Sequence, residues 1–346
     1  MNKKKILYIN YMLQYGHINF DRIQISALKS SGYDVRLIMH YNIAKQLMFP
    51  LSDYELIIPK YLGINSDNPI LNRLLYILIL LYIKVKVRIN SFDKTIVSNL
   101  DEITLGIVPL SKKMYIFSHS NSNDFNFKIK KIFLKRLSKN NNIIVFNELM
   151  KEPYISNGIQ KIFVISHGCL PPFKFLEYHL PIDISKFNFI VFHPSTKIDE
   201  TFKHELRTNV TLHHFLTKNN FALIVRDQDL VVNKCNNIII IRDYLATEQY
   251  QALFVASDVI LLVYPDTFKY KVSGISYEAF ANNKKLLIYK NPALDYCIDY
   301  YNYDPMFLTI EQLCTKIEYL YQNHSAKCMV KGNTLSPNYS LLLNDF

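Results

Sequence analysis

Residues 258–288 read DVILLVYPDTFKYKVSGISYEAFANNKKLLI, and this stretch decides the fold. It begins with an uninterrupted apolar run, VILLVY, which is typical of a strand buried on both faces. A polar turn then presents Ser273 and Gly274, a helical segment carrying Glu278 follows, and a second apolar run begins at Lys285. Two strands joined through a helix pair in parallel, so this stretch predicts an open α/β sheet.

The same alternation of apolar runs and helical patterns covers most of the chain. Strands are expected in KKILYIN, VRLIM, KTIVSNL, KMYIFSH, NIIVFN and KIFVISHG, and later in FNFIVFH, FALIVRD, NNIIII, VILLVYP and KLLIYK. Between the two groups lies HGCLPPFKFLEYHLPIDISKFN, which has three prolines and no clear period. We therefore predict two Rossmann-like α/β domains facing each other across a cleft, at residues 1–170 and 188–330. A linker would occupy 171–187, and a tail at 331–346 would pack back on the first domain.

The composition is that of a globular protein. The chain has 346 residues, of which 49% are hydrophobic and 20% are charged. Its five cysteines are scattered, with no CxxC pair, which argues against a zinc site and against a disulfide framework. The apolar run after the basic N-terminal residues is too short for a signal peptide, so we expect a cytoplasmic location.

Nearly all of the net charge of +11 lies in the first half of the chain. Residues 1–170 hold 23 Lys and Arg against 11 Asp and Glu, whereas residues 171–346 hold 17 against 18. This asymmetry indicates an anionic partner, either a membrane surface or nucleic acid, although a genome rich in lysine codons would also produce it. Because no nucleic-acid-binding module is present, we expect no nucleic acid partner. The basic segment FKIKKIFLKRLSK at 127–139 is either a membrane-facing helix or a cover helix with a solvated face.

The most apolar segment, PILNRLLYILILLYIKVKVRIN at 69–90, has an uninterrupted apolar core only over residues 74–83. A bilayer crossing takes about 20 apolar residues, so the segment does not predict a spanning helix. We favour a buried helix of the first domain. The alternative is a helix that lies in the membrane interface, with Lys84, Lys86 and Arg88 reaching the head groups.

The second half resembles the glycosyltransferases of the GT-B fold, which have two Rossmann-like domains. In that family an Ala-Asp pair, an apolar strand and Pro are followed by Ser-Gly, by Glu-Ala, and by Gly-Lys-Pro before the next strand. The matching residues here are Ala256 to Asp258, VILLVYP, Ser273, Gly274, Glu278, Ala279 and Asn283 to Lys285. The resemblance is close over residues 238–290 and loose over most of the chain. It implies an enzyme of bacterial capsule, lipopolysaccharide or exopolysaccharide biosynthesis.

The resemblance places a nucleotide-sugar donor in the second domain. A helix that starts at Ser273 and Gly274 offers free N–H groups and a positive dipole end to a diphosphate. Glu278 would accept hydrogen bonds from the ribose hydroxyls. An ordinary capped helix with a solvated glutamate is the alternative.

The resemblance implies further donor contacts: the family binds the diphosphate from its first strand-loop-helix, where Ser195 and Lys197 stand here, and Lys271 flanks the position of a family glutamate. Arg226 is expected there because it ends a strand. A solvated lysine or a surface salt bridge is the ordinary alternative for each charge. The family's second glutamate is Tyr270 here, so the sequence does not decide between retention and inversion of the anomeric centre. The family's glycine before Lys-Pro is Asn283, so this turn must form without glycine.

The first domain is expected to supply the base and the acceptor contacts. His119, which follows a strand, resembles the family's active-site histidine. An inverting transferase needs a general base for the acceptor hydroxyl, and His119 and Asp124 are the predicted pair. The expected lining of the cleft on the acceptor side consists of Gly16, His17, His167 and Gly168. Polar surface loops would present the same residue types.

The leading hypothesis is a metal-independent glycosyltransferase that moves a sugar from a nucleotide-diphosphate donor, first of all a UDP-sugar, to a growing, lipid-linked cell-surface glycan. It would act at an anionic membrane surface, on the inner face of the bacterial inner membrane. The nucleotide-sugar is a substrate, and no cofactor or metal is expected because the sequence has no DxD-type acidic cluster. Two alternatives remain: a sugar-nucleotide epimerase of the same architecture, and a non-catalytic sugar- or nucleotide-binding assembly subunit.

Overall fold

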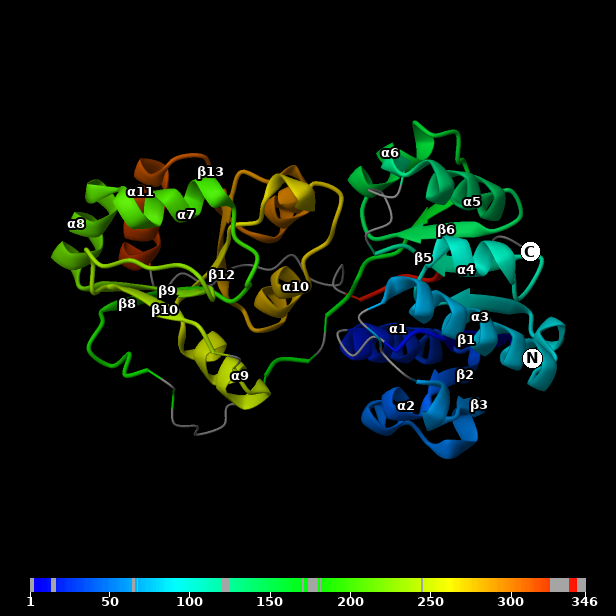
Figure 1. Ribbon diagram of the computed structural model, residues 1–346. Coiled ribbons are helices and arrows are strands. Elements are labelled where there is room, and N and C mark those ends of the chain that lie inside the picture. The colour runs from blue at the N-terminus through cyan, green and yellow to red at the C-terminus, as the bar shows by residue number, and fades with distance from the viewer. Residues whose placement is uncertain are drawn as a thin grey trace. The chain divides into compact units, whose positions relative to one another are not determined.

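The computed structural model describes residues 3–13, 17–63, 66, 68–119, 125–169, 171–173, 180, 182–243, 245–323 and 336–340. These residues form two compact units, shown in Figure 1. The first unit contains the described residues up to Gly168 together with 336–340, and the second contains those from Cys169 to Asn323.

The first unit is built on a seven-stranded sheet in the order β3-β2-β1-β4-β5-β6-β7. Every pair of neighbouring strands is parallel. The strands are β1 (Lys5–Asn10), β2 (Asp34–His40), β3 (Tyr54–Ile58), β4 (Lys94–Val97), β5 (Met114–Phe117), β6 (Asn142–Val145) and β7 (Ile162–Val164). Because β4 to β6 are buried on both faces, none of them alternates apolar and polar residues, and apart from Lys94 at the start of β4 their residues are apolar or neutral.

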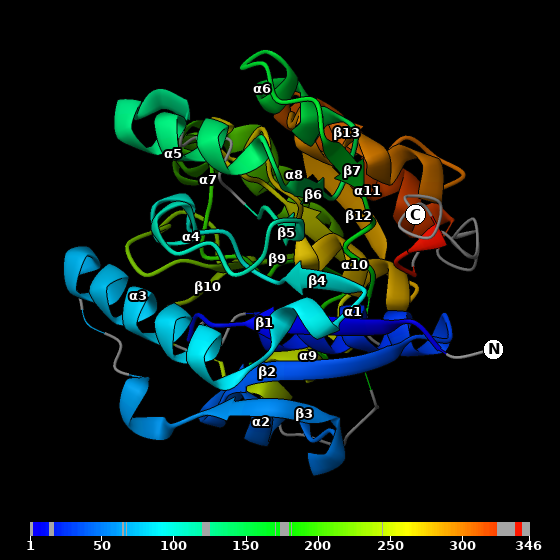
Figure 2. The ribbon, with the colours of Figure 1, turned by 90° about the vertical axis from the view of Figure 1, so that its right-hand side faces the viewer.

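The helices of this unit are α1 (Ile18–Ser30), α2 (Tyr41–Leu47), α3 (Pro69–Lys86), α4 (Glu102–Ile107), α5 (Lys128–Ser138) and α6 (Glu152–Ile155). Helix α4 contacts both α3 and α5. Figure 2 shows these three helices following one another along one side of the unit.

Helix α3 corrects one expectation. The preferred interpretation of residues 69–90 was a buried helix, but only Ile79, Leu80 and Ile83 of α3 are buried. Six apolar side chains on its other faces are exposed: Ile70, Leu71, Leu74, Leu78, Leu81 and Val85. The helix is apolar all round, and the sheet covers only one side of it. No helix among the described residues has the length and apolar character needed to cross a bilayer.

The second unit repeats the design with a six-stranded parallel sheet in the order β10-β9-β8-β11-β12-β13. Its strands are β8 (Phe189–His193), β9 (Phe221–Arg226), β10 (Ile238–Ile241), β11 (Val259–Leu262), β12 (Lys285–Tyr289) and β13 (Met306–Phe307). Its helices are α7 (Glu200–Thr208), α8 (Val210–Asn219), α9 (Thr247–Ala256), α10 (Gly274–Ala281) and α11 (Ile310–Gln322).

Each sheet has the strand order of a Rossmann-like domain, so the prediction of two parallel α/β domains is confirmed. In each sheet the order reverses beside the first strand of the unit. The loops after β1 and β4, and those after β8 and β11, leave the sheets at these points. Ligands of open α/β sheets bind there, beyond the carboxyl ends of the strands.

Candidate functional site

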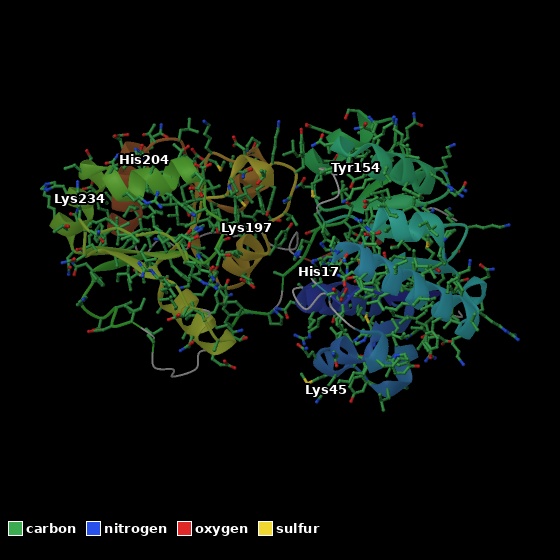
Figure 3. All side chains as sticks on the ribbon, viewed as in Figure 1. His17, Lys45, Tyr154, Lys197, His204 and Lys234 are labelled. Atoms are coloured by element: carbon green, nitrogen blue, oxygen red, sulfur yellow. The ribbon has the colours of Figure 1, made fainter. Side chains whose placement is uncertain are left out.

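Three cationic side chains gather at the carboxyl edge of the second sheet. Lys197 belongs to the loop after β8 (Figure 3), Arg226 ends β9, and Lys271 precedes α10. Partial burial lowers the pKa of Lys271, and the positive charge of Lys197 lowers it further. The charge of Lys197 therefore acts on the Lys271 ammonium group. Neither lysine makes an ion pair with any residue that the structure describes.

Arg226 is held by the loop that it faces. Its Nη1 donates a 3.0 Å hydrogen bond to the carbonyl oxygen of Pro194. Its Nε is buried and has no hydrogen-bond partner among the described residues. Leaving a charged donor unpaired is costly, so this edge of the sheet suits a ligand that carries acceptor oxygens.

Helix α10 begins beside these cations. Ser273 is its N-cap, and the Ser273 hydroxyl accepts a 3.3 Å hydrogen bond from the backbone N–H of Ser276. The same hydroxyl lies 2.9 Å from the hydroxyl of Tyr264, so it is committed to the protein. A Cβ placed on Gly274 would meet no atom within 4 Å, so the space beside the first turn is open. An anion would thus meet the backbone of this turn rather than the Ser273 side chain.

Glu278 lies one turn into α10, and its Oε2 accepts a 2.6 Å hydrogen bond from the hydroxyl of Tyr250 on α9. Burial raises the pKa of Glu278, while the Tyr250 bond lowers it. Burial also raises the pKa of Tyr250, helped by the Glu278 charge and opposed by the positive charge of Arg226. Arg226, Tyr250 and Glu278 therefore form one electrostatic group.

Two residues that the sequence did not single out complete this edge. His193 ends β8, and its Nδ1 donates a 2.8 Å hydrogen bond to the carbonyl oxygen of Leu261. Burial lowers the pKa of His193 to about 4, so the ring is neutral at pH 7. Tyr264 follows β11 and stacks on Phe268 with ring centroids 4.1 Å apart. Ser195, which was predicted at the donor, accepts from the Lys197 N–H. Burial raises the pKa of Tyr264, and Ser195 opposes that shift.

The first unit holds a histidine cluster at the carboxyl edge of its own sheet. His17 (Figure 3) is the N-cap of α1, His119 follows β5, and His167 follows β7. The rings of His17 and His119 lie 4.2 Å apart between centroids. His119 and His167 both pack against Phe20 and Phe146. Three of the predicted site residues are therefore brought together.

Hydrogen bonds fix which nitrogen of two of these rings carries the proton. Nε2 of His119 lies 3.0 Å from the carbonyl oxygen of Ser98, and Nδ1 of His167 lies 3.0 Å from that of Gly168. A carbonyl only accepts, so the lone pair is on Nδ1 of His119 and on Nε2 of His167. Burial lowers the pKa of His167 to about 4 and that of His119 well below its usual value, with the neighbouring histidines adding to both effects. Both rings are neutral at pH 7 and can accept a proton.

A buried carboxylate lies behind this cluster. Asp21 of α1 is 0% exposed and accepts hydrogen bonds from Tyr8, Asn10 and Ser98 at 2.9, 2.6 and 2.5 Å. Burial raises its pKa to about 6, against the effect of these hydrogen bonds. Because Ser98 also accepts from His119, Asp21 fixes the loop that holds the His119 ring.

The 336–340 segment reaches the same region. The Tyr339 hydroxyl donates to Oε1 of Gln24, and Nε2 of Gln24 donates a 2.8 Å hydrogen bond to the carbonyl oxygen of His167. Gly168, which was predicted to line a cleft, has a left-handed φ of 75° and is packed. A Cβ there would lie 2.6 Å from Ile23 and 2.8 Å from Pro337. Its role in the structure is to let these side chains approach.

Two predicted site residues, Gly16 and Asp124, lie outside the described residues. No group of three or more His, Cys, Asp or Glu side chains in the described part of the chain is arranged to hold a metal ion.

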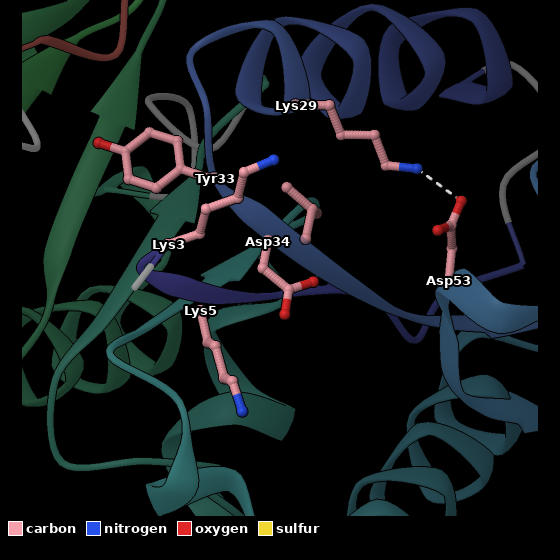
Figure 4. Close-up of a pocket in the computed structure, with 7 residues that line it drawn as sticks. Lys3, Lys5, Lys29, Tyr33, Asp34 and Asp53 are labelled. Atoms are coloured by element: carbon pink, nitrogen blue, oxygen red, sulfur yellow. Dashed lines mark hydrogen bonds and ion pairs between the residues drawn. The ribbon is translucent and has the colours of Figure 1, made fainter. Parts of the chain in front are cut away.

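A cavity of about 610 Å³ lies at the opposite, amino edge of the first sheet (Figure 4). It is lined by Lys3, Lys5, Lys29, Tyr33, Asp34, Val35 and Asp53. Lys29 and Asp53 neutralise each other at 2.5 Å, and the lining carries both signs of charge. This cavity is not at the strand ends where ligands of such sheets bind.

Solved structures share this architecture across nearly the whole chain. The HepE protein of Anabaena, in complex with UDP-glucose, aligns over 96% of this chain and 93% of its own, with a TM-score of 0.59 and 14% identity. Sucrose-phosphate synthase of Thermosynechococcus elongatus aligns over 98% and 96%, with a TM-score of 0.58 and 11% identity. A UDP-N-acetylglucosamine 2-epimerase aligns over 97% and 94%, with a TM-score of 0.58 and 10% identity. No protein-family model matches the sequence, and no curated protein matches it significantly.

These similarities and the two Rossmann-like units define the GT-B fold. At such low identity they establish the fold alone, since one architecture hosts several activities.

Proposed function

We propose that this protein is a glycosyltransferase that uses a nucleotide-diphosphate sugar, first of all a UDP-sugar, as donor. The second unit binds the donor and the first unit supplies the base and the acceptor site. The transfer joins an acceptor hydroxyl oxygen to the anomeric carbon. The bond from that carbon to the β-phosphate oxygen breaks, the nucleoside diphosphate leaves with the bonding electron pair, and the hydroxyl proton passes to the base.

One observation carries the proposal: Lys197 in the loop after β8, Arg226 at the end of β9 and Lys271 just before α10 bring three cations to the carboxyl edge of the second sheet, and neither lysine has an ion pair among the described residues. Like charges in proximity are unfavourable unless an anion lies between them. A diphosphate fits because it also takes the dipole end of α10 and the free donor of Arg226. Glu278, held by Tyr250, has a second carboxylate oxygen for a ribose hydroxyl.

We assign the base to His119, whose Nδ1 lone pair is available because Nε2 is bound to Ser98. Asp124 remains a candidate partner from the sequence. The chemistry needs no metal, because the three cations and the helix dipole neutralise the departing diphosphate. EDTA is therefore expected to leave activity unchanged.

We further propose that the acceptor is a growing, lipid-linked cell-surface glycan and that the protein works peripherally at the inner face of the bacterial inner membrane. The charge asymmetry of the chain supports this, since residues 1–170 hold 23 cationic against 11 anionic side chains.

Thermal unfolding with UDP, GDP, CMP and TDP tests donor binding, because a ligand that binds only the folded protein raises Tm. UDP is expected to give the largest shift. Glu278→Ala is expected to reduce the UDP shift, whereas Glu248→Ala on the exposed side of the neighbouring helix α9 is the matched control and retains it. The proposal fails if no nucleotide shifts Tm.

The epimerase of the same fold is the second candidate, because its structure aligns over 97% of this chain. Incubation with UDP-sugars followed by product analysis separates the two. A C2-epimerised nucleotide sugar without an acceptor identifies an epimerase, whereas sugar transfer and free UDP identify a transferase. Nucleotide binding with neither product identifies an assembly subunit.

A further inference from the structure

Helix α3 presents a continuous apolar row to solvent. Its members recur every three or four positions, so they share one face of the helix: Ile70, Leu74, Leu78, Leu81 and Val85. Val85 is 82% exposed and Ile70 is 67% exposed. The buried residues Ile79 and Ile83 lie on the opposite side of the helix. A contiguous exposed apolar surface of this kind marks an interaction site.

Helix α5 continues the same surface. Ile129 and Ile132 are exposed at a spacing of three residues, and Arg136 stands one turn further along the same face. Helix α4 lies between α3 and α5 and contacts both, and Ile107 at its end is also exposed. We call the exposed surface of α3, α4 and α5 the docking face (Figure 2).

Cations outnumber carboxylates on the docking face. Arg73 of α3 is paired with Asp101, the N-cap of α4, at 3.3 Å. Neither α3 nor α5 contains an aspartate or a glutamate. The carboxylate of α4, Glu102, is buried and lies 3.4 Å from Lys130. An apolar surface set among cations that outnumber the carboxylates is complementary to an anionic bilayer. A second copy of the chain would place like charges against each other, so it fits this face less well.

A cavity of about 440 Å³ opens where α3, α4 and α5 end. Its cationic lining residues are Lys84, Lys112 and Arg136, and no carboxylate lines it. None of the three makes an ion pair within the described part of the chain. Lys84 stands three residues after Leu81 of the apolar row and is its neighbour on the helix surface, so the cavity and the row adjoin.

We propose that the docking face lies on an anionic bilayer and that this cavity receives the phosphate of an anionic phospholipid headgroup. The apolar row of α3 would enter the boundary between head groups and acyl chains, as an interfacial helix does. Lys84, Lys112 and Arg136 would hold the phosphate. This inference rests on the proposed function for the membrane as the place of the acceptor, and it adds the surface and the lipid site.

Sedimentation of the full chain with vesicles tests both parts. Binding is expected with vesicles of phosphatidylcholine containing phosphatidylglycerol, weaker binding with phosphatidylcholine alone, and release by salt. Val85→Gln is expected to weaken binding, whereas Val210→Gln, at a residue of α8 that is 74% exposed, is the matched control. Absence of binding, or equal effects of the two variants, would overturn the docking face.

The lipid site has its own control on the same face. Lys112→Gln combined with Arg136→Gln is expected to lower vesicle affinity roughly 25-fold, about fivefold for each charge near the bilayer. Lys128→Gln combined with Lys135→Gln removes as many charges from α5 without touching the cavity and is expected to cost clearly less. Equal losses would show diffuse attraction and overturn the headgroup site. A rise in Tm with inorganic phosphate, in a protein that does not bind the vesicles, would overturn it as well.

The Tm shift with UDP distinguishes this inference from the donor proposal. The shift is expected to be unchanged in both valine variants and in both double variants of Lys and Arg. Vesicle binding without any nucleotide effect on Tm would contradict the proposed transferase but support the docking face. Nucleotide binding without vesicle binding would support donor binding and contradict the docking face.

Discussion

The hydroxyl of Tyr250 and Oε2 of Glu278 are joined by a 2.6 Å hydrogen bond between α9 and α10. The bond holds a half-buried carboxylate in one orientation. Under the proposed function, the other carboxylate oxygen meets the donor ribose.

Tyr250→Phe is therefore expected to weaken UDP binding about tenfold, because the carboxylate loses the hydrogen bond that orients it. The variant should lose only about 1 kcal/mol of unfolding free energy. Calorimetric titration with UDP measures the affinity, and Tyr321→Phe at an exposed position of α11 serves as control. Unchanged affinity would remove Tyr250 and Glu278 from the donor site.

Lys271→Gln is expected to weaken binding of UDP roughly tenfold but to leave uridine binding nearly unchanged, because under the proposed function the lysine faces the diphosphate and not the base. Folding stability should not fall, since the repulsion from Lys197 is relieved. Comparison of UDP and uridine affinities at two salt concentrations measures this. The exposed Lys218→Gln controls for the loss of one charge, and an equal effect on both ligands would contradict the assignment.

The buried histidines predict how stability depends on pH. The pKa of His193 is about 4 in the folded protein, below its ordinary value of 6.5, so its contribution is fully present above pH 6.5 and is lost as pH falls towards 4. For His193 this amounts to about 3 kcal/mol. His119 and His167 act in the same direction. Asp21 acts oppositely, because its raised pKa makes its contribution greatest below about pH 4 and lost as pH rises through about 6.

Urea unfolding of the wild type and of His193→Gln between pH 4 and pH 7 isolates the histidine, since Asp21 contributes equally to both. The variant should show a shallower rise in unfolding free energy with pH. His204→Gln, at an exposed position of α7, should keep the wild-type slope. Parallel profiles for the wild type and His193→Gln would contradict the neutral buried ring.

Gly168→Ala is expected to destabilise the first unit more than Gly158→Ala does. Both glycines have left-handed φ angles, 75° and 82°, which cost a residue with a Cβ about 1–2 kcal/mol. Only at Gly168 would the Cβ also meet Ile23 and Pro337, whereas nothing lies within 4 Å at Gly158. Urea unfolding measures both, and equal losses would show that the contacts around Gly168 relax freely.

Strand positions were predictable because a parallel sheet buried on both faces imposes continuous apolar runs, such as VILLVYP. Once the strands were placed, the residues after them fell at one edge, which is why His17, His119 and His167 meet. β3 was not predicted because its pattern is short and only partly buried. Asn283 takes the left-handed conformation, with φ of 55°, where the family has glycine.

The residues that were missed depend on neighbours distant in the sequence. Tyr250 lies in a helical segment without any marked feature, and only the packing of α9 beside α10 brings it to Glu278. His193 could have been predicted from the sequence, because it stands at the end of the strand FNFIVFH in the same way that His119 stands after KMYIFS. The burial of α3 was misjudged because a helix that is apolar all round does not reveal which side the sheet covers.

The bond between Tyr339 and Gln24 makes the first unit discontinuous along the chain. On the ribosome, residues 336–340 are made after all of the second unit, so Gln24 of α1 lacks its Tyr339 partner while residues 169–323 are being synthesised. A partly made chain would therefore have an incomplete first core. The Tyr339 hydrogen bond to Gln24, whose side chain also binds the carbonyl oxygen of His167, would form last.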